Sequence, residues 1–171
     1  MKKVDTLSDV VKRTSYDSDT NNLLEEFYIP ALSVSKKYFR LAGFFSSTSI
    51  KVASKGVRSL IKNGGTMRLI TGVNLTSADY DAIEKNVINP DDIISKNISE
   101  EISKFTEDDF SLQHAKLLGW MLRNNILEIK IAIKPEPGIF HQKVGILQDI
   151  NEERISFSGS NNETANGWLH N

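Results

Sequence analysis

The sequence predicts an α/β protein: a single domain in which one mixed β-sheet carries helices on both faces. A chain of 171 residues is long enough to bury one substantial core. Two short apolar segments, 38–45 and 67–71, flank a helical pattern at about 49–63, which is typical of a βαβ unit with parallel strands. More helical patterns and then a strand-rich end follow, and this order favours a sheet of mixed strand directions.

The expected elements follow one another along the whole chain. They are a loose polar arm at 1–19, a helix at about 21–35, a strand at 38–45, a helix at about 49–63, a strand at 67–71, helices at about 78–86, 91–105 and 108–123, a strand at 127–133, and a hairpin that joins 140–147 to the segment beginning at Ile155.

Local signals mark the ends of the helices. Asp19 or Thr20 can cap the first helix, and Pro30 predicts a kink or a break within it. Gly64 and Gly65 end the second helix, because glycine readily adopts the left-handed conformation that closes a helix.

The strands show two patterns of side chains. The strand at 38–45 is mostly apolar, as expected for a strand buried on both faces. The strand at 127–133 instead alternates, with Ile129, Ile131 and Ile133 on one side.

Composition excludes several classes of protein. The chain has no cysteine, so neither a disulfide framework nor a thiolate metal site is possible. No apolar run reaches membrane-spanning length, and the first residues have no signal-peptide core. These features predict a cytoplasmic protein without a membrane partner.

The net charge of −1 hides an uneven distribution of charge. No acidic residue lies between Glu26 and Asp79, whereas acidic residues cluster from Asp79 to Asp109. The acid-free span carries Lys36, Lys37, Arg40, Lys51, Lys55, Arg58, Lys62 and Arg68. Either this span forms a positive face for phosphate, with Lys36, Lys37, Arg40, Lys51, Lys55 and Arg58 as the candidate contacts, or both runs are ordinary solvated faces.

The C-terminal hairpin carries the residues with the clearest chemistry. Alternation along its first strand places His141 and Lys143 on one face and Gln142 on the other. Ser160 and Asn162 follow the second strand. An imidazole nucleophile beside a cation, a hydroxyl and an amide is the set of groups that attack on a phosphodiester needs.

The pattern His-x-Lys, a hairpin, then Gly-Ser-x-Asn resembles the HKD motif of the phospholipase D superfamily. The longer strings 140–146 and 156–165 are similar to the phospholipase D-like nuclease domain at the front of some bacterial superfamily 2 helicases and type III restriction-like proteins. Segments 38–48 and 63–72 are also similar to early parts of that fold. The resemblance therefore implies a phospholipase D-like fold over residues 1–171, as the N-terminal part of a longer protein with helicase-type domains downstream.

The resemblance also implies a role for each motif residue. His141 would attack phosphorus and form a phosphohistidine, while Lys143 and Asn162 would hold the non-bridging oxygens. Ser160 would support the histidine or the phosphate. No metal and no cofactor is implied for this domain. Because only the His-x-Lys at His141 is followed by Gly-Ser-x-Asn, the chain has one complete motif, and a homodimer with a shared active site would supply the second histidine.

Two positions depart from the family pattern. Gln148 stands where the family often has an acid, and Asp149, one place later, is either a site acid or, as we favour, a turn residue. The acid that usually partners the histidine is expected beyond Asn171, and Glu163 is the only acid after Gly159.

Other candidate residues have simpler interpretations. His114 is expected to be structural and Trp120 to lie in the core, whereas His170 and Trp168 are left unassigned. The predicted function is therefore a metal-independent nuclease acting on nucleic acid, with DNA as the favoured substrate. The alternative is a non-catalytic module of the same fold that binds nucleic acid or dimerises, and a lipid-acting enzyme is less favoured.

Overall fold

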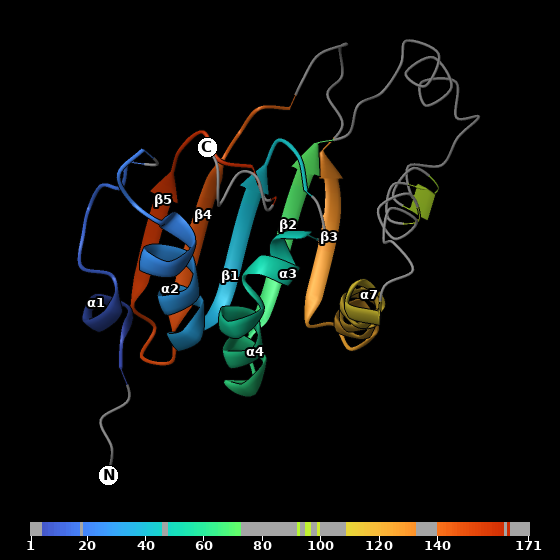
Figure 1. Cartoon of the computed structure of the whole chain (residues 1–171), viewed down its shortest axis with the longest axis horizontal. Coiled ribbons are helices and arrows are strands. Elements are labelled where there is room, and N and C mark those ends of the chain that lie inside the picture. Colours follow the sequence, from blue (N-terminus) through green and yellow to red (C-terminus); the bar gives the residue numbers. More distant parts are fainter. Residues whose placement is uncertain are drawn as a thin grey trace.

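A computed structural model describes residues 5–17, 19–45, 48–72, 92, 95–96, 99, 109–132, 140–162 and 164. Its centre is a five-stranded sheet with the strand order β3-β2-β1-β4-β5 (Figure 1). The strands are β1 (Ser35–Ala42), β2 (Thr66–Gly72), β3 (Leu127–Ala132), β4 (Val144–Asp149) and β5 (Arg154–Ser158). β1, β2 and β3 are parallel, and β4 is antiparallel to both β1 and β5. The predicted mixed sheet, βαβ unit and C-terminal hairpin are therefore confirmed.

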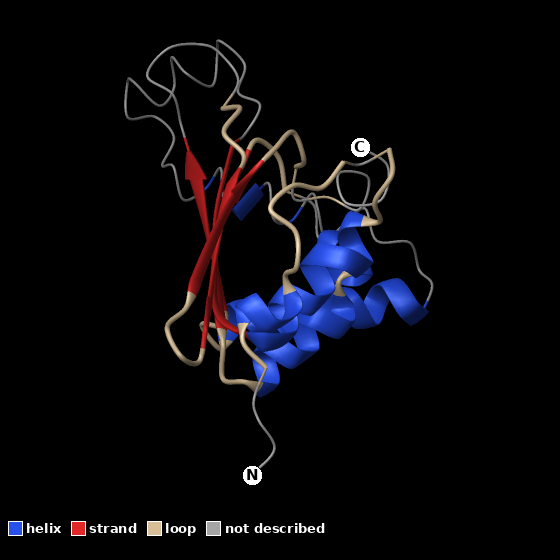
Figure 2. Ribbon diagram, turned by 90° about the vertical axis from the view of Figure 1, so that its left-hand side faces the viewer, coloured by secondary structure: helices blue, strands red, loops and turns tan. Residues whose placement is uncertain are grey.

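In the described part of the chain, six helices pack on this sheet, and all of them lie on the same side of it (Figure 2). They are α1 (Leu7–Val10), η1 (Leu24–Tyr28), α2 (Ile29–Val34), α3 (Thr48–Val52), α4 (Ser54–Lys62) and α7 (Asp109–Arg123). The predicted coverage of both faces is therefore wrong for the part of the chain that the structure describes.

The side chains of β1 explain the one-sided packing. Tyr38 and Ala42 are buried under the helices, whereas Phe39 and Leu41, on the other face, are only half-buried. Apolar residues occur on both faces of this strand, so its sequence resembles that of a strand covered twice. Which face receives the helices depends on the connections between elements, and these are not encoded in one strand.

The N-terminal segment is anchored, so the predicted loose arm is wrong for α1. Leu7 is fully buried, and its backbone N–H donates to Asp149 Oδ2 across 3.1 Å. Thr6 and Asp9 form a reciprocal capping box at the start of this helix. One leucine and one capping box are too little sequence to predict a buried helix, because the residues around them are polar.

The helix predicted at 21–35 is confirmed as two pieces, because a π-helical turn, η1, passes into α2 at Ile29, one residue before Pro30. The predicted caps Asp19 and Thr20 are wrong. Asn22 provides the cap instead: its Oδ1 accepts from the N–H of Glu25 at 3.1 Å. The Asn22 N–H in turn donates to Glu26 Oε1 at 3.0 Å.

The helix predicted at 49–63 is present as α3 and α4, which meet at Ala53. Gly64 has a φ of 68° and Gly65 donates to the carbonyl of Leu60 at 2.8 Å, which confirms the predicted helix end. No helix in the described part of the chain is long and apolar enough to cross a membrane.

The third section of the chain is described only in part. The helices predicted at 78–86 and 91–105 lie largely outside the described residues, whereas α7 matches the helix predicted at 108–123. Trp120 is 45% exposed, so the prediction that it lies in the core is wrong. It lies two residues, or about 200° of helical rotation, from the buried Leu118 and therefore faces the opposite way.

Candidate functional site

The predicted site residues gather at one edge of the sheet, the edge that is formed by the ends of the strands. Parallel β1, β2 and β3 all end at this edge, where β4 begins and β5 ends (Figure 1). His141 and Lys143 lie just before β4, whose first residue is Val144, so the prediction that both belong to the strand is wrong. Ser160 and Asn162 lie just after β5. Ligand sites of open α/β sheets commonly occupy the carboxyl ends of the parallel strands.

Lys143 is a buried cation with spare hydrogen-bond donors. Its residue is 7% exposed, and its Nζ donates to the backbone carbonyl of His141 at 3.2 Å. An ammonium group has three hydrogens to donate. The other two have no partner among the described residues.

Gly43, the residue after β1, shows how closely the site groups converge. A Cβ atom on Gly43 would lie 2.9 Å from the carbonyl oxygen of Phe140. The same Cβ would lie 3.1 Å from Asn162 Oδ1 and 3.5 Å from Lys143 Nζ. Gly72, at the end of β2, is equally confined, because a Cβ there would lie 2.8 Å from the carbonyl oxygen of Gly43. Glycine at both strand ends therefore leaves the room that brings Lys143 and Asn162 together.

Asn162 is oriented by the backbone that follows β1. Its Oδ1 accepts a hydrogen bond from the N–H of Phe44 at 3.2 Å. Because a backbone N–H can only donate, the accepting atom is the oxygen, and the Nδ2 amino group points elsewhere. The two hydrogens on Nδ2 have no partner among the described residues, so the Asn162 side chain still has donors to offer, although the atom beside Gly43 is its Oδ1.

The His141 imidazole and the Ser160 hydroxyl lie on the outside of this edge. Both residues are exposed. The carbonyl of His141 accepts from Lys143 Nζ, and Ser160 Oγ donates to Asn161 Oδ1 at 3.3 Å. No acid among the described residues hydrogen-bonds to the imidazole.

Asp149 is a turn residue, as favoured from the sequence. Its Oδ1 accepts from the N–H groups of Asn151 at 2.8 Å and Glu153 at 3.0 Å. Its Oδ2 accepts from Leu7, and the residue lies at the end of β4 farthest from His141. Asp149 is therefore not the acid that orients the histidine. Glu163, the other acid considered, lies outside the described residues, as do His170, Trp168 and the side chain of His114.

The predicted surface cations separate into different environments. Arg40 is only 4% exposed, so its assignment as a surface contact for nucleic acid is wrong. Its guanidinium lies over the Phe157 ring and donates to the carbonyl of Asn161. Alternation along β1 puts residue 40 on the helix-covered face, a fact that the charge run alone does not reveal.

The remaining cations of that run lie on β1, β2, α3 and α4. Lys37 is exposed near the amino end of β1, and Lys36 and Lys51 are half-buried. Lys55, Arg58 and Lys62 are exposed along the outer side of α4. Arg68, on the uncovered face of the sheet, pairs with Glu128 at 3.0 Å.

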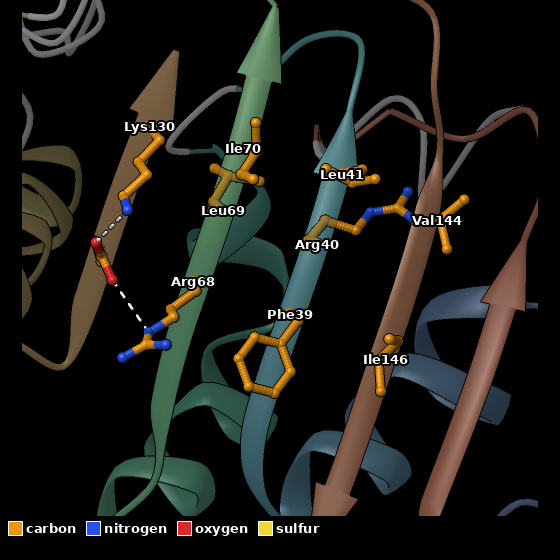
Figure 3. Close-up of a pocket in the computed structure, with 10 residues that line it drawn as sticks. Phe39, Arg40, Leu41, Arg68, Leu69, Ile70, Lys130, Val144 and Ile146 are labelled. Atoms are coloured by element: carbon orange, nitrogen blue, oxygen red, sulfur yellow. Dashed lines mark ion pairs between the residues drawn. The ribbon is translucent and has the colours of Figure 1, made fainter. Parts of the chain in front are cut away.

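That uncovered face holds a shallow hollow of about 400 Å³ (Figure 3). Its apolar floor consists of Phe39, Leu41, Ile70, Val144 and Ile146. Arg68 and Lys130 both pair with Glu128 at its side. It contains none of the four motif residues, so it is separate from the site at the sheet edge.

Among the described residues, no three His, Cys, Asp or Glu side chains lie close enough together to hold a metal ion. Neither the models of known protein families nor the curated proteins give a match to this chain.

Proposed function

We propose that this chain is a phosphodiesterase module that cleaves nucleic acid, with DNA as its substrate, through a phosphohistidine. The supporting observation is the convergence of Lys143 Nζ and Asn162 Oδ1 within 3.5 Å of one point at Gly43. Both side chains keep donors that are unused among the described residues. Two such donors, one of them cationic, match the two non-bridging oxygens of a phosphodiester. The likeness of the hairpin to the HKD motif of the phospholipase D superfamily supports the same reaction.

The proposed reaction has two steps. In the first, a His141 ring nitrogen attacks phosphorus, a P–N bond forms, and the P–O bond to the leaving strand breaks. Lys143 and Asn162 stabilise the charge that develops on the non-bridging oxygens. In the second, water attacks phosphorus, the P–N bond breaks, and the histidine is regenerated. Neither step requires a metal ion.

The leaving oxygen needs a proton that His141 cannot supply while it is bonded to phosphorus. We propose that a second copy of the chain supplies it from its own histidine across a two-fold axis. The exposed position of His141 at the edge of the sheet suits this arrangement, because an exposed imidazole is accessible to a partner.

The wider role follows the same resemblance. The module would act in the cytoplasm as the front part of a helicase or restriction-type protein, with exposed cations such as Lys37, Lys55 and Arg58 contacting the DNA backbone. Arg40 is left out of this set because it is buried.

The deciding experiment is cleavage of plasmid DNA in excess EDTA by the full-length protein that contains this chain. We expect cleavage by the wild type and none by His141→Ala. Gln142→Ala is the matched control, since Gln142 is the exposed neighbour of His141 and has no role in the proposed chemistry. Cleavage that persists in His141→Ala, or that requires a divalent cation, would contradict the mechanism.

The alternative is a non-catalytic module that binds nucleic acid or dimerises its parent protein. It is favoured by one observation, the absence of an acid bonded to the His141 imidazole among the described residues. An imidazole without such a partner has no fixed tautomer. DNA binding by a dimeric full-length protein that never cleaves DNA would support this alternative.

A further inference from the structure

A buried arginine connects the centre of the sheet to the loop that carries Ser160 and Asn162. Arg40 lies on β1, opposite Gly145 of β4, and Gly145 lies opposite Phe157 of β5. These three residues form a row across three neighbouring strands on the helix-covered face. Arg40 is 4% exposed, which is unusual for a permanently charged side chain.

Gly145 makes room for the middle of this row. A Cβ on Gly145 would lie 2.1 Å from the Phe157 ring, so no other residue fits beneath it. The ring also packs against Phe27 and Tyr28, with centroids 4.9 and 5.8 Å away. Phe157 is therefore held rigidly, and the Arg40 guanidinium lies over it, 5.2 Å from the ring centroid.

The same guanidinium reaches the site loop. Arg40 Nη2 donates to the carbonyl oxygen of Asn161. The next residue, Asn162, accepts from the N–H of Phe44 at 3.2 Å. Two consecutive loop residues are thus held by β1 and its extension, one through the backbone and one through the side chain.

We infer that Arg40 is a positioning residue for the site. It fixes the backbone at Asn161. Asn162 therefore stays next to Gly43 and Lys143, and Ser160 stays at the same end of the sheet. Arginine suits the position because its planar guanidinium can lie on a ring and still donate in its own plane. Lysine offers a point charge and cannot meet both requirements with the same geometry. The inference rests on the proposed function for its kinetic consequence, although not for the structural one.

Hydrogen exchange of the Phe44 amide reports the position of the loop directly, because that amide donates to Asn162. In Arg40→Met we expect its protection to fall by about tenfold or more, while amides inside β1 keep theirs. Arg40→Lys should give an intermediate loss. Phe157→Leu should also lower the protection of the Phe44 amide, since it keeps an apolar side chain but removes the ring under the guanidinium.

The kinetic measurement uses DNA cleavage by the full-length protein. Arg40→Met should lower kcat by about tenfold to a hundredfold and change KM much less, because donors displaced by an ångström weaken the transition state most. Met67→Ala is the control: Met67 is 5% exposed in β2, so the change costs stability without touching the loop.

Two results would overturn the inference. One is unchanged protection of the Phe44 amide in folded Arg40→Met and Phe157→Leu proteins. The other is that Met67→Ala loses as much amide protection and as much kcat as Arg40→Met. Arg40 would then act only through the overall stability of the fold. If the wild type never cleaves DNA, the proposed function fails, and the Phe44 amide still decides whether Arg40 positions the loop.

Discussion

At the scale of single residues, the site depends on what Gly43 lacks. The carbonyl of Phe140, the side-chain oxygen of Asn162 and the ammonium of Lys143 all approach the place where a Cβ would be. A carbonyl 2.9 Å away is closer than Cβ atoms tolerate, and a backbone atom cannot move as easily as a side-chain end.

Gly43→Ala should therefore disturb the site more than the fold. We expect the new methyl group to displace Phe140 and Asn162 and to lower the rate of DNA cleavage by about tenfold or more. Gly119→Ala is the control, because a Cβ on that helical glycine meets nothing within 4 Å. Equal rates for the two variants, measured in one cleavage assay, would show that Gly43 has no such role.

Lys143 illustrates a conflict between stability and function at the same scale. A buried ammonium group with one hydrogen bond among the described residues is costly to the fold, so its removal should stabilise the protein. Function instead needs the charge, because it is the only buried cation beside Asn162 for which the described residues leave hydrogens unused.

Lys143→Met should accordingly raise the melting temperature by a few degrees and abolish binding of phosphate or tungstate. Differential scanning calorimetry and titration calorimetry measure the two effects separately. Lys37→Met, at an exposed position on the same sheet, should change neither. A melting temperature that falls in Lys143→Met would mean that the cation has a structural partner.

At the scale of elements, α4 combines a buried side with a charged side. Gly56, Val57 and Leu60 are buried, whereas Lys55, Arg58 and Lys62 are exposed at spacings of three and four residues. Cations at this spacing share one side of a helix, so α4 presents a positive strip about 10 Å long. No acid occurs in this helix to neutralise the strip.

Reversal of this charge, as Lys55→Glu, Arg58→Glu and Lys62→Glu together, should weaken DNA binding and its dependence on salt. The slope of log affinity against log salt should become shallower by about two to three, since each lost phosphate contact removes about 0.9. Fluorescence anisotropy at several salt concentrations measures this slope. Lys130→Glu, on the opposite face of the sheet, is the control, and an unchanged slope in the triple variant would exclude α4 from the interface.

At the scale of the whole molecule, one copy of the chain provides one His-x-Lys that is followed by Gly-Ser-x-Asn. His141 is exposed at the edge of the sheet, and the described residues provide no second histidine at that edge. The reaction proposed above needs both a nucleophile and a general acid, and in that proposal a second molecule supplies the acid.

Mixing of subunits tests this requirement. When wild type and His141→Ala are mixed equally and allowed to exchange, a shared site should leave about a quarter of the activity, because only wild-type pairs are active. Independent sites should leave about half. Light scattering of the same mixtures checks that the protein is a dimer, and an active monomer would contradict the shared site.

The sequence by itself determined the parts of this protein that depend on neighbours along the chain. Apolar segments of strand length predicted β1 and β2, an alternating pattern predicted β3, and Gly64 and Pro30 marked a helix end and a break. The spacing of the C-terminal motif predicted that His141, Lys143, Ser160 and Asn162 meet at one end of a hairpin. These features are local, because a hairpin brings its own ends together.

Only the tertiary structure decided which side chains are buried and what they meet. It placed Arg40 under the helices, brought Lys143 and Asn162 to Gly43, and anchored Leu7 to Asp149, 142 residues further along the chain. It also put all the described helices on one face of the sheet (Figure 2). Burial and long-range hydrogen bonds depend on the order and register of strands far apart in the sequence, and no single segment contains that information.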